Sequence, residues 1–206
     1  MVEFKGGIMS FKRIAVYCGS AHGSTDAYGA LAKSLGAELA RRDIELVYGG
    51  GRVGLMGILA DAVLAGNGRV TGVIPRKLDA LELGHRGCQD LFIVESMHER
   101  KAMMMYLSDG FIALPGGFGT LEELSEVISL GTLNFHRKPV GILDNNGFYT
   151  HLIQFFERAK SDGFIRPKQG EFLQYHCDPK SLIDAMLQHR PANIEDWLEP
   201  ENKSQH

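Results

Sequence analysis

Two glycine-rich segments and two pairs of charged residues carry the chemistry that this sequence suggests. The glycines cluster in segments 49–54 (GGGRVG) and 115–120 (PGGFGT), each directly after an apolar run. Glycine lets the backbone approach a ligand closely and leaves its amide groups uncovered. The charged pairs are Arg100-Lys101 and Glu122-Glu123; arginine and lysine are common counter-charges of phosphate. We therefore predict a site for a small molecule that carries a phosphate or carboxylate group.

The segment 115–120 gives the stronger signal. A strand stops at Pro115 and a helix is expected to begin at Thr120, so that the helix N-terminus, with its free N–H groups and partial positive charge, can hold an anion. It is not a Walker A loop, because no lysine follows the glycines. Thr120 and Glu123 also have the spacing of a capping box, which stabilises a helix by about 1 kcal/mol. Spacing alone does not separate the binding role from the capping role.

The segment 49–54 matches the pattern G-x-G-x-x-G between a strand and a helix. A dinucleotide site would place an acidic residue about 20 positions further on, at the end of the next strand. That strand instead ends at Pro75-Arg76, and the glycines follow the second strand rather than the first, so NAD binding is not favoured. The alternatives are a tight turn with close helix packing, or a nucleotide contact through uncovered amides of Gly50 and Gly51.

The helix expected over 97–107 places Arg100 and Lys101 in its first turns. They suit a phosphate, although a solvated basic turn is the commoner role for such a pair. His98-Glu99 resembles the start of the zinc-protease motif HExxH, but position 102 is alanine, so that reading fails. Met103–Met105 is interpreted as core filler. We expect no metal site.

Apolar runs that predict strands alternate with helical patterns along the chain. This alternation predicts an α/β fold, a Rossmann-like doubly wound parallel sheet of about six strands flanked by helices. Ligands bind such sheets beyond the carboxyl ends of the strands, where both glycine segments fall. Residues 76–90 are expected to form a loop. The expected strands are 14–18, 44–48, 70–74, 91–94, 111–114 and 140–143. The first expected helix follows a cap at Ser24 or Thr25 and has an apolar face from Tyr28 to Leu39. The other expected helices are 55–64, 97–107, 121–130, 148–159 and 179–188.

Composition excludes several classes of protein. The 206 residues carry a formal net charge of −3, which argues against nucleic-acid binding through bulk positive charge. No apolar run approaches the ~18 residues that span a bilayer, and the start has no signal-peptide pattern. Three cysteines without CxxC spacing fit a reducing compartment, and we expect a cytoplasmic protein. We expect one domain over 1–206, with a mobile leader (1–11) and tail (200–206).

Together these segments resemble the lonely-guy family of cytokinin-activating phosphoribohydrolases, formerly often labelled lysine decarboxylase-like. The resemblance covers roughly residues 12–160. It rests on the segments 17–20 (YCGS), 47–51 (VYGGG), 54–57 (GLMG) and 72–75 (GVIP), and above all on MHxRK at 97–101 and PGGxGTxxE at 115–123. The last two, in this order and spacing, are highly specific to the family.

The resemblance implies a Rossmann-like homodimer that hydrolyses the N-glycosidic bond of a nucleoside 5′-monophosphate to a free base and ribose 5-phosphate. No cofactor, nucleic acid or membrane is implied, and the site would lie near the dimer interface. Arg100 and Glu123 match the positions regarded as catalytic. The matching substrate-binding positions are Lys101, Gly116, Gly117, Gly119, Thr120 and Glu122, and more loosely Glu82; Gly50, Gly51 and Ser20 complete the predicted set.

One departure from the family pattern follows the glutamates. The family commonly continues Thr-Trp-x-Gln-Leu, whereas this chain has Ser129-Leu130-Gly131-Thr132-Leu133. Loss of the Trp and Gln is expected to alter the base pocket or the dimer contact. Two other functions are alternatives to hydrolysis. One is a carrier of a nucleotide or molybdenum cofactor on the same scaffold, which needs no Arg100–Glu123 pair. The other is a pyridoxal-phosphate decarboxylase, for which the sequence shows no lysine in the context of a Schiff base.

Overall fold

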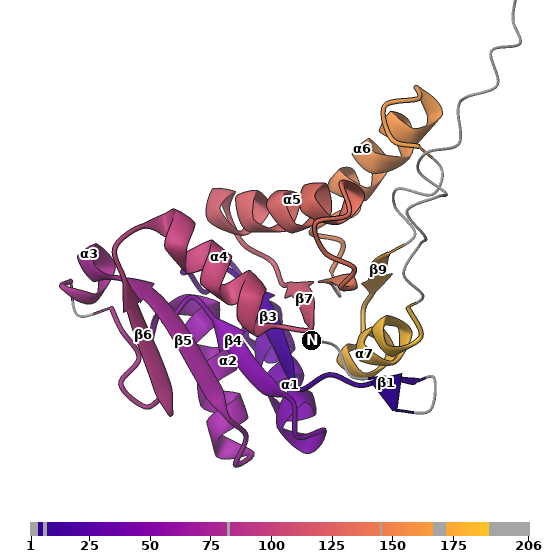
Figure 1. Ribbon diagram of the computed structural model, residues 1–206. Helices are drawn as coiled ribbons and strands as arrows, with labels where there is room; N and C mark the ends of the chain where they lie inside the picture. The colour runs from indigo at the N-terminus through magenta and orange to yellow at the C-terminus, as the bar shows by residue number, and fades with distance from the viewer. Residues whose placement is uncertain (1–3, 6–7, 82, 145, 167–171, 190–206) are drawn as a thin grey trace, which may run out of the picture.

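A computed structural model describes residues 4–5, 8–81, 83–144, 146–166 and 172–189. Its centre is a parallel seven-stranded sheet in the order β6-β5-β4-β3-β7-β8-β9 (Figure 1). The strands are β3 (Arg13–Tyr17), β4 (Glu45–Tyr48), β5 (Val70–Pro75), β6 (Asp90–Val94), β7 (Gly110–Ala113), β8 (Val140–Leu143) and β9 (Leu173–His176).

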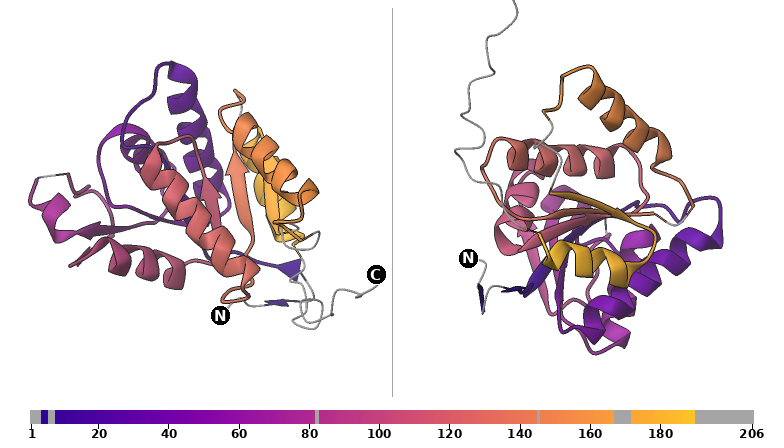
Figure 2. Two further views of the ribbon diagram at one scale, coloured as in Figure 1. Left: turned by 90° about the horizontal axis from the view of Figure 1, so that it is seen from above. Right: turned by 90° about the vertical axis from the view of Figure 1, so that its right-hand side faces the viewer.

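Helices cover both faces of this sheet (Figure 2). One face carries α1 (Asp26–Arg41), α2 (Gly54–Ala65) and α7 (Pro179–Leu187). The other carries α4 (Met97–Leu107), α5 (Phe118–Thr132) and α6 (Thr150–Ser161). The predicted doubly wound fold is confirmed.

The inner strands of the sheet contribute side chains to the cores on both faces, because successive side chains of a strand point to opposite faces. Ile14 and Val16 of β3 pack with α1 and α2, whereas Ala15 and Tyr17 pack with α4 and α5. Burial on both faces makes these strands continuous apolar runs, which is why the sequence reveals them.

Three elements differ from the prediction. The sheet has a seventh strand, β9, at its edge; its sequence, LQYH, is half-exposed and lacks the apolar run that marked the others. A single turn of helix, α3 (Arg76–Asp79), interrupts the predicted loop over 76–90. Before the sheet, β1 (Phe4–Lys5) pairs with β2 (Ile8–Met9). Phe11, within the leader expected to be mobile, is buried in the core; the tail 200–206 lies outside the described residues.

The strand order reverses direction between β3 and β7, which are neighbours at the middle of the sheet. Such a switch point leaves a crevice at the carboxyl ends of the two strands, and ligands of this architecture bind there. The loops after β3 and β7 hold the segments YCGS and PGGFGT. The fold therefore brings two of the predicted motifs to the place where a ligand is expected.

Candidate active site

Three loops meet above the switch point and are bonded to one another. The Gly19 N–H donates to the Pro115 carbonyl at 3.1 Å, and the Leu55 N–H donates to the Gly19 carbonyl at 3.1 Å. Gly54 lies at φ +60°, and a Cβ atom there would stand 2.3 Å from the Ser20 carbonyl carbon. Only glycine fits this position, both for its backbone angle and for the contact.

Arg100 of α4 and Glu123 of α5 face each other across these loops. Arg100 Nη2 donates to Glu123 Oε1 at 2.5 Å, and the side chains are 12% and 5% exposed. The two residues predicted as catalytic are thus a nearly buried ion pair that joins two helices. Such charge-assisted bonds are stronger than neutral ones and fix the orientation of both groups.

Gly49 creates the space that the guanidinium occupies. A Cβ on Gly49 would stand 2.7 Å from Arg100 Nη2, closer than real side-chain contacts allow. The sequence analysis did not assign this role to Gly49, because it depends on which distant side chain reaches the strand end. The only signal available was its place at the start of the GGGRVG segment.

Lys101 lies beside this pair but is bound to other carboxylates. Its ammonium group donates to Glu122 and stands 3.3 Å from Glu126 Oε2, one turn further along α5. Lys101 is 8% exposed, whereas Glu122 is 53% exposed. Arg100 and Lys101, which are adjacent on α4, therefore both bind carboxylates of α5. The fold brings together Lys101 and Glu122, which were both predicted as site residues.

Burial sets the electrostatics of the carboxylate. It raises the pKa of Glu123 above its ordinary value, and the adjacent Arg100 opposes that rise. The pKa of the buried Tyr17 hydroxyl is also raised, first by burial and then by the charge of Glu123. Arg100 Nε is buried without a hydrogen-bond partner in the described part of the chain. The site thus combines a protonatable carboxylate with a cation that has an unused donor.

The start of α5 differs from the prediction. The helix begins at Phe118 with Gly117 as its N-cap, and no side chain caps it. Of the two roles that the spacing left open, the capping box is therefore excluded: Thr120 lies inside the first turn and is buried against Gly116, and Glu123 bonds Arg100. A Cβ on Gly116 would stand 2.1 Å from Thr120 Oγ1.

Gly117 and Gly119 have open space where a side chain would project. Both lie at the first turn of α5, and both are exposed. A side-chain-free helix start next to the Arg100–Glu123 pair offers an anion direct access to the backbone.

The GGGRVG segment pairs with another loop instead of offering all of its amides. The His85 N–H donates to the Gly50 carbonyl at 2.8 Å, and the Arg52 N–H donates to the Leu83 carbonyl at 2.9 Å. Gly50 and Gly51 are buried. These bonds use the Gly50 carbonyl and the Arg52 amide, so the expected contact through the amides of Gly50 and Gly51 stays a prediction. Ser20 is exposed beside Gly54, and Glu82 lies outside the described residues.

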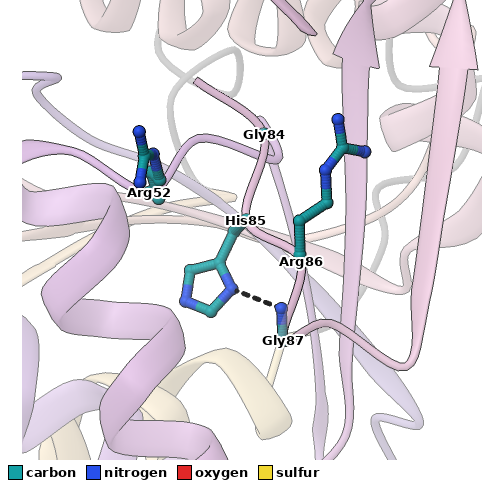
Figure 3. Close-up of a pocket in the computed structure, with 5 residues that line it drawn as sticks. All are labelled: Arg52, Gly84, His85, Arg86 and Gly87. Atoms are coloured by element: carbon teal, nitrogen blue, oxygen red, sulfur yellow. Dashed lines mark hydrogen bonds between the residues drawn. The ribbon is translucent and has the colours of Figure 1, made fainter. Parts of the chain in front are cut away.

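A separate hollow of about 520 Å³ is lined by Arg52 and by residues 84–87 (Figure 3). His85 Nδ1 accepts the Gly87 N–H, and His85 Nε2 lies 3.0 Å from Asp61 of α2. Arg86 pairs with Asp79 at 2.7 Å. The contact with α2 places this hollow toward the opposite face of the sheet from Arg100 and Glu123.

Among the described residues, no group of three or more His, Cys, Asp or Glu side chains has the arrangement of a metal site. None of the helices in those ranges is long and apolar enough to cross a membrane.

Comparisons with known proteins agree on one family and one fold. A family model described as possible lysine decarboxylase matches residues 56–186. A probable cytokinin riboside 5′-monophosphate phosphoribohydrolase of Oryza sativa subsp. japonica is 46% identical over 89% of this chain and 75% of its own. A cytokinin riboside 5′-monophosphate phosphoribohydrolase of Arabidopsis thaliana is 45% identical over 89% of this chain and 80% of its own.

Solved structures share the fold at lower identity. A molybdenum cofactor binding protein of Rippkaea orientalis has a TM-score of 0.65 at 19% identity, covering 85% of this chain and 94% of that one. The molybdenum cofactor carrier protein of Chlamydomonas reinhardtii has a TM-score of 0.64 at 18% identity, covering 85% and 96%. At these identities the likeness shows the architecture alone.

Proposed function

The chain belongs to the lonely-guy family of cytokinin riboside 5′-monophosphate phosphoribohydrolases, and from that premise we propose that it is an N-glycosyl hydrolase of nucleoside 5′-monophosphates. Water adds to C1′ of the ribose, the C1′–N bond breaks, and the products are a free base and ribose 5-phosphate. AMP or a cytokinin riboside monophosphate is the substrate. The observation that carries the proposal is the Arg100–Glu123 pair, buried at the switch point of the sheet.

Glu123 stabilises the transition state. Breaking a glycosidic bond builds positive charge on the ribose ring, and a carboxylate beside the ring stabilises that charge or activates the attacking water. Glu123 is 5% exposed, so its charge is little screened by solvent. Arg100 holds the carboxylate in place at 2.5 Å and orients the substrate; it is a poor proton donor, because a guanidinium group stays protonated in proteins.

The 5′-phosphate binds at the start of α5. Arg100 and Lys101 carry two positive charges against the three negative charges of Glu122, Glu123 and Glu126, a local sum of −1. This cluster alone does not attract a phosphate. The attraction for the phosphate comes instead from the open backbone at Gly117 and Gly119 and from the positive end of the α5 dipole. The phosphate then positions the sugar against Glu123.

The active protein is a homodimer that buries the outer face of α4 and α5. Large apolar side chains stand exposed on these helices and just beyond α5: Tyr106 near the end of α4 is 86% exposed, Phe118 at the start of α5 93%, and Phe135 three residues past α5 76%. Large exposed apolar side chains of this kind support an interaction surface along the two helices. Phe118 adjoins the phosphate-binding glycines, so this face lies beside the site. The three cysteines are unpaired, which suits the cytoplasm.

A carrier of molybdenum cofactor is the weaker alternative. The carriers share the fold at 18–19% identity, whereas relatives at 44–46% identity are named phosphoribohydrolases. A carrier has no need of the Arg100–Glu123 pair, which this chain has. Persistent binding of an intact ligand without turnover would favour it.

The test is incubation of the purified protein with AMP and chromatography for adenine and ribose 5-phosphate. We expect release by the wild type and at least about a 100-fold loss in Glu123→Gln. Glu157→Gln, which makes the same change on α6 away from the site, is the matched control and should keep full activity. Adenosine should react poorly, because it lacks the positioning phosphate. No release from AMP or any other nucleoside monophosphate would contradict the proposal, as would equal turnover of adenosine and AMP.

A further inference from the structure

A second cavity, of about 470 Å³, lies between α5, α6 and β9, away from Arg100 and Glu123. Its wall is largely apolar and aromatic. We call it the α5–α6 groove and define it by six of its lining residues: Ile128, Thr132, Phe156, Phe164, Phe172 and Tyr175. The proposed hydrolysis uses none of them.

The groove leaves large apolar side chains in water. Phe164 is 84% exposed and Tyr175 is 42% exposed, although both line a concave apolar surface. Scattered exposed aromatics are ordinary, but several around one hollow indicate a surface that something covers. Thr132, Glu157 and Lys160 supply polar groups at its margin.

The described chain ends close to this groove. His189 is buried, and its ring bonds the backbone of Arg137, five residues past the end of α5. Phe172, in the groove wall, accepts the Val140 N–H at the start of β8. Arg137 and Val140 are three residues apart, so the chain leaves the fold at the edge of the sheet where the groove begins.

Seventeen residues follow His189, and their sequence suits the groove. Ile194, Trp197 and Leu198 are spaced i, i+3 and i+4, the spacing that puts apolar side chains on one side of a helical turn. Asn193 precedes this run as a candidate cap, and Pro200 ends it. An extended chain spans about 3.3 Å per residue, so Trp197, eight residues after His189, can reach roughly 26 Å.

We propose that the segment 194–198 docks in the α5–α6 groove of its own chain, with Trp197 and Leu198 covering Phe164 and Tyr175. The segment acts as a strap that ties α6 to α5. Its acidic Glu195 and Asp196 carry the charge opposite to that of Lys160, which lines the groove and pairs with Glu157 at 2.6 Å. The inference does not depend on the proposed hydrolysis.

Trp197 is the single tryptophan of the chain, so tryptophan fluorescence reports on this segment alone. We expect the full-length protein to show blue-shifted emission and weak quenching by acrylamide relative to the same protein in urea. Phe164→Glu should shift the emission toward the unfolded value, because it removes a wall of the groove and repels the acidic segment. Phe155→Glu is the matched control: Phe155 lies on α6, whereas Phe164 lies three residues past its end, and Phe155 is 64% exposed but does not line the groove, so emission should stay unchanged.

Three results would overturn the proposal. Trp197 could be as accessible to acrylamide as in urea, or it could be shielded equally in both phenylalanine variants, which would place it elsewhere. Trp197 could also lose its shielding on dilution while light scattering shows the protein dissociating. That result would assign the groove to a second copy. Amide hydrogen exchange gives an independent readout: a chain ending at His189 should exchange faster over 150–165, and unchanged exchange there would also refute the strap.

Discussion

Replacing Gly49 with alanine tests how the site is built, because it alters a catalytic side chain without touching it chemically. The added Cβ would stand 2.7 Å from Arg100 Nη2, and ordinary contacts begin at 3.4 Å. A shift of 3.4 − 2.7 = 0.7 Å in the guanidinium would restore an ordinary contact. The guanidinium is the end of a flexible side chain, so the fold can absorb the shift, but the bond to Glu123 Oε1 at 2.5 Å cannot persist unchanged.

A displacement of about 1 Å in a catalytic group costs on the order of 100-fold in rate. We therefore expect Gly49→Ala to lower kcat/KM for AMP by roughly 10- to 100-fold, measured by adenine release. Circular dichroism and Tm should stay near the wild type. Gly29→Ala makes the same change in α1, where the nearest atom is the end of the Ile58 side chain at 3.3 Å, and should leave activity intact.

A double-mutant cycle shows whether the effect passes through Arg100. If it does, Gly49→Ala should cost almost nothing further in an Arg100→Ala background, because the displaced group is already gone. Additive losses in the double variant would refute the reasoning. So would a Gly49→Ala enzyme with kcat/KM within about twofold of the wild type.

Three further outcomes follow from the same geometry. Because burial raises the pKa of Glu123, the active carboxylate should be lost as pH falls through a value above its usual 4.5, so the acid limb of a kcat/KM–pH profile should inflect above that value; an inflection at or below 4.5 would contradict this. Gly54→Ala should destabilise the protein by more than about 1 kcal/mol in urea unfolding, because φ is +60° and the Cβ meets Ser20 backbone. Lys101→Met should lower Tm and raise KM more than it lowers kcat, since Lys101 ties α4 to Glu122 and Glu126; a change confined to kcat would argue for a catalytic role.

The sequence predicts the inner strands well for a physical reason. Parallel strands covered on both faces must be largely apolar, and Ile44–Tyr48, apolar except for Glu45, is readable as such; the structure has β4 at Glu45–Tyr48. The two edge strands, β6 and β9, do not meet that requirement, because one side of each has no neighbour and both are largely exposed or half-exposed. The apolar run Leu91–Val94 still reveals β6, whereas the sequence LQYH of β9 contains no such run, and β9 is therefore the strand that the pattern misses.

The sequence predicts those residues of the candidate site that stand in short, contiguous motifs. Arg100 and Glu123 stand in compact motifs, and the fold brings them within 2.5 Å of each other. Gly49 is not predictable in this way, because its role depends on a side chain 51 positions further along the chain. The same limit applies at Thr120: capping and binding share one spacing, and only the observed helix start at Phe118 separates them.

The departure from the family pattern at residues 129–133 is expected to affect contacts with a second copy of the chain more than substrate binding within one chain. An α-helix rises about 1.5 Å per residue, so Ser129 and Thr132 lie roughly 9 and 14 Å along α5 from Glu123. Leu130 is half-buried and does not line the α5–α6 groove, and Leu133 beyond it is 62% exposed. A base held against Glu123 does not extend that far. We therefore expect Leu130→Trp to shift the monomer–dimer equilibrium in analytical ultracentrifugation, and any change in base preference to appear only at concentrations where the dimer forms. An altered preference in the dissociated monomer would show that this position reaches the base within one chain.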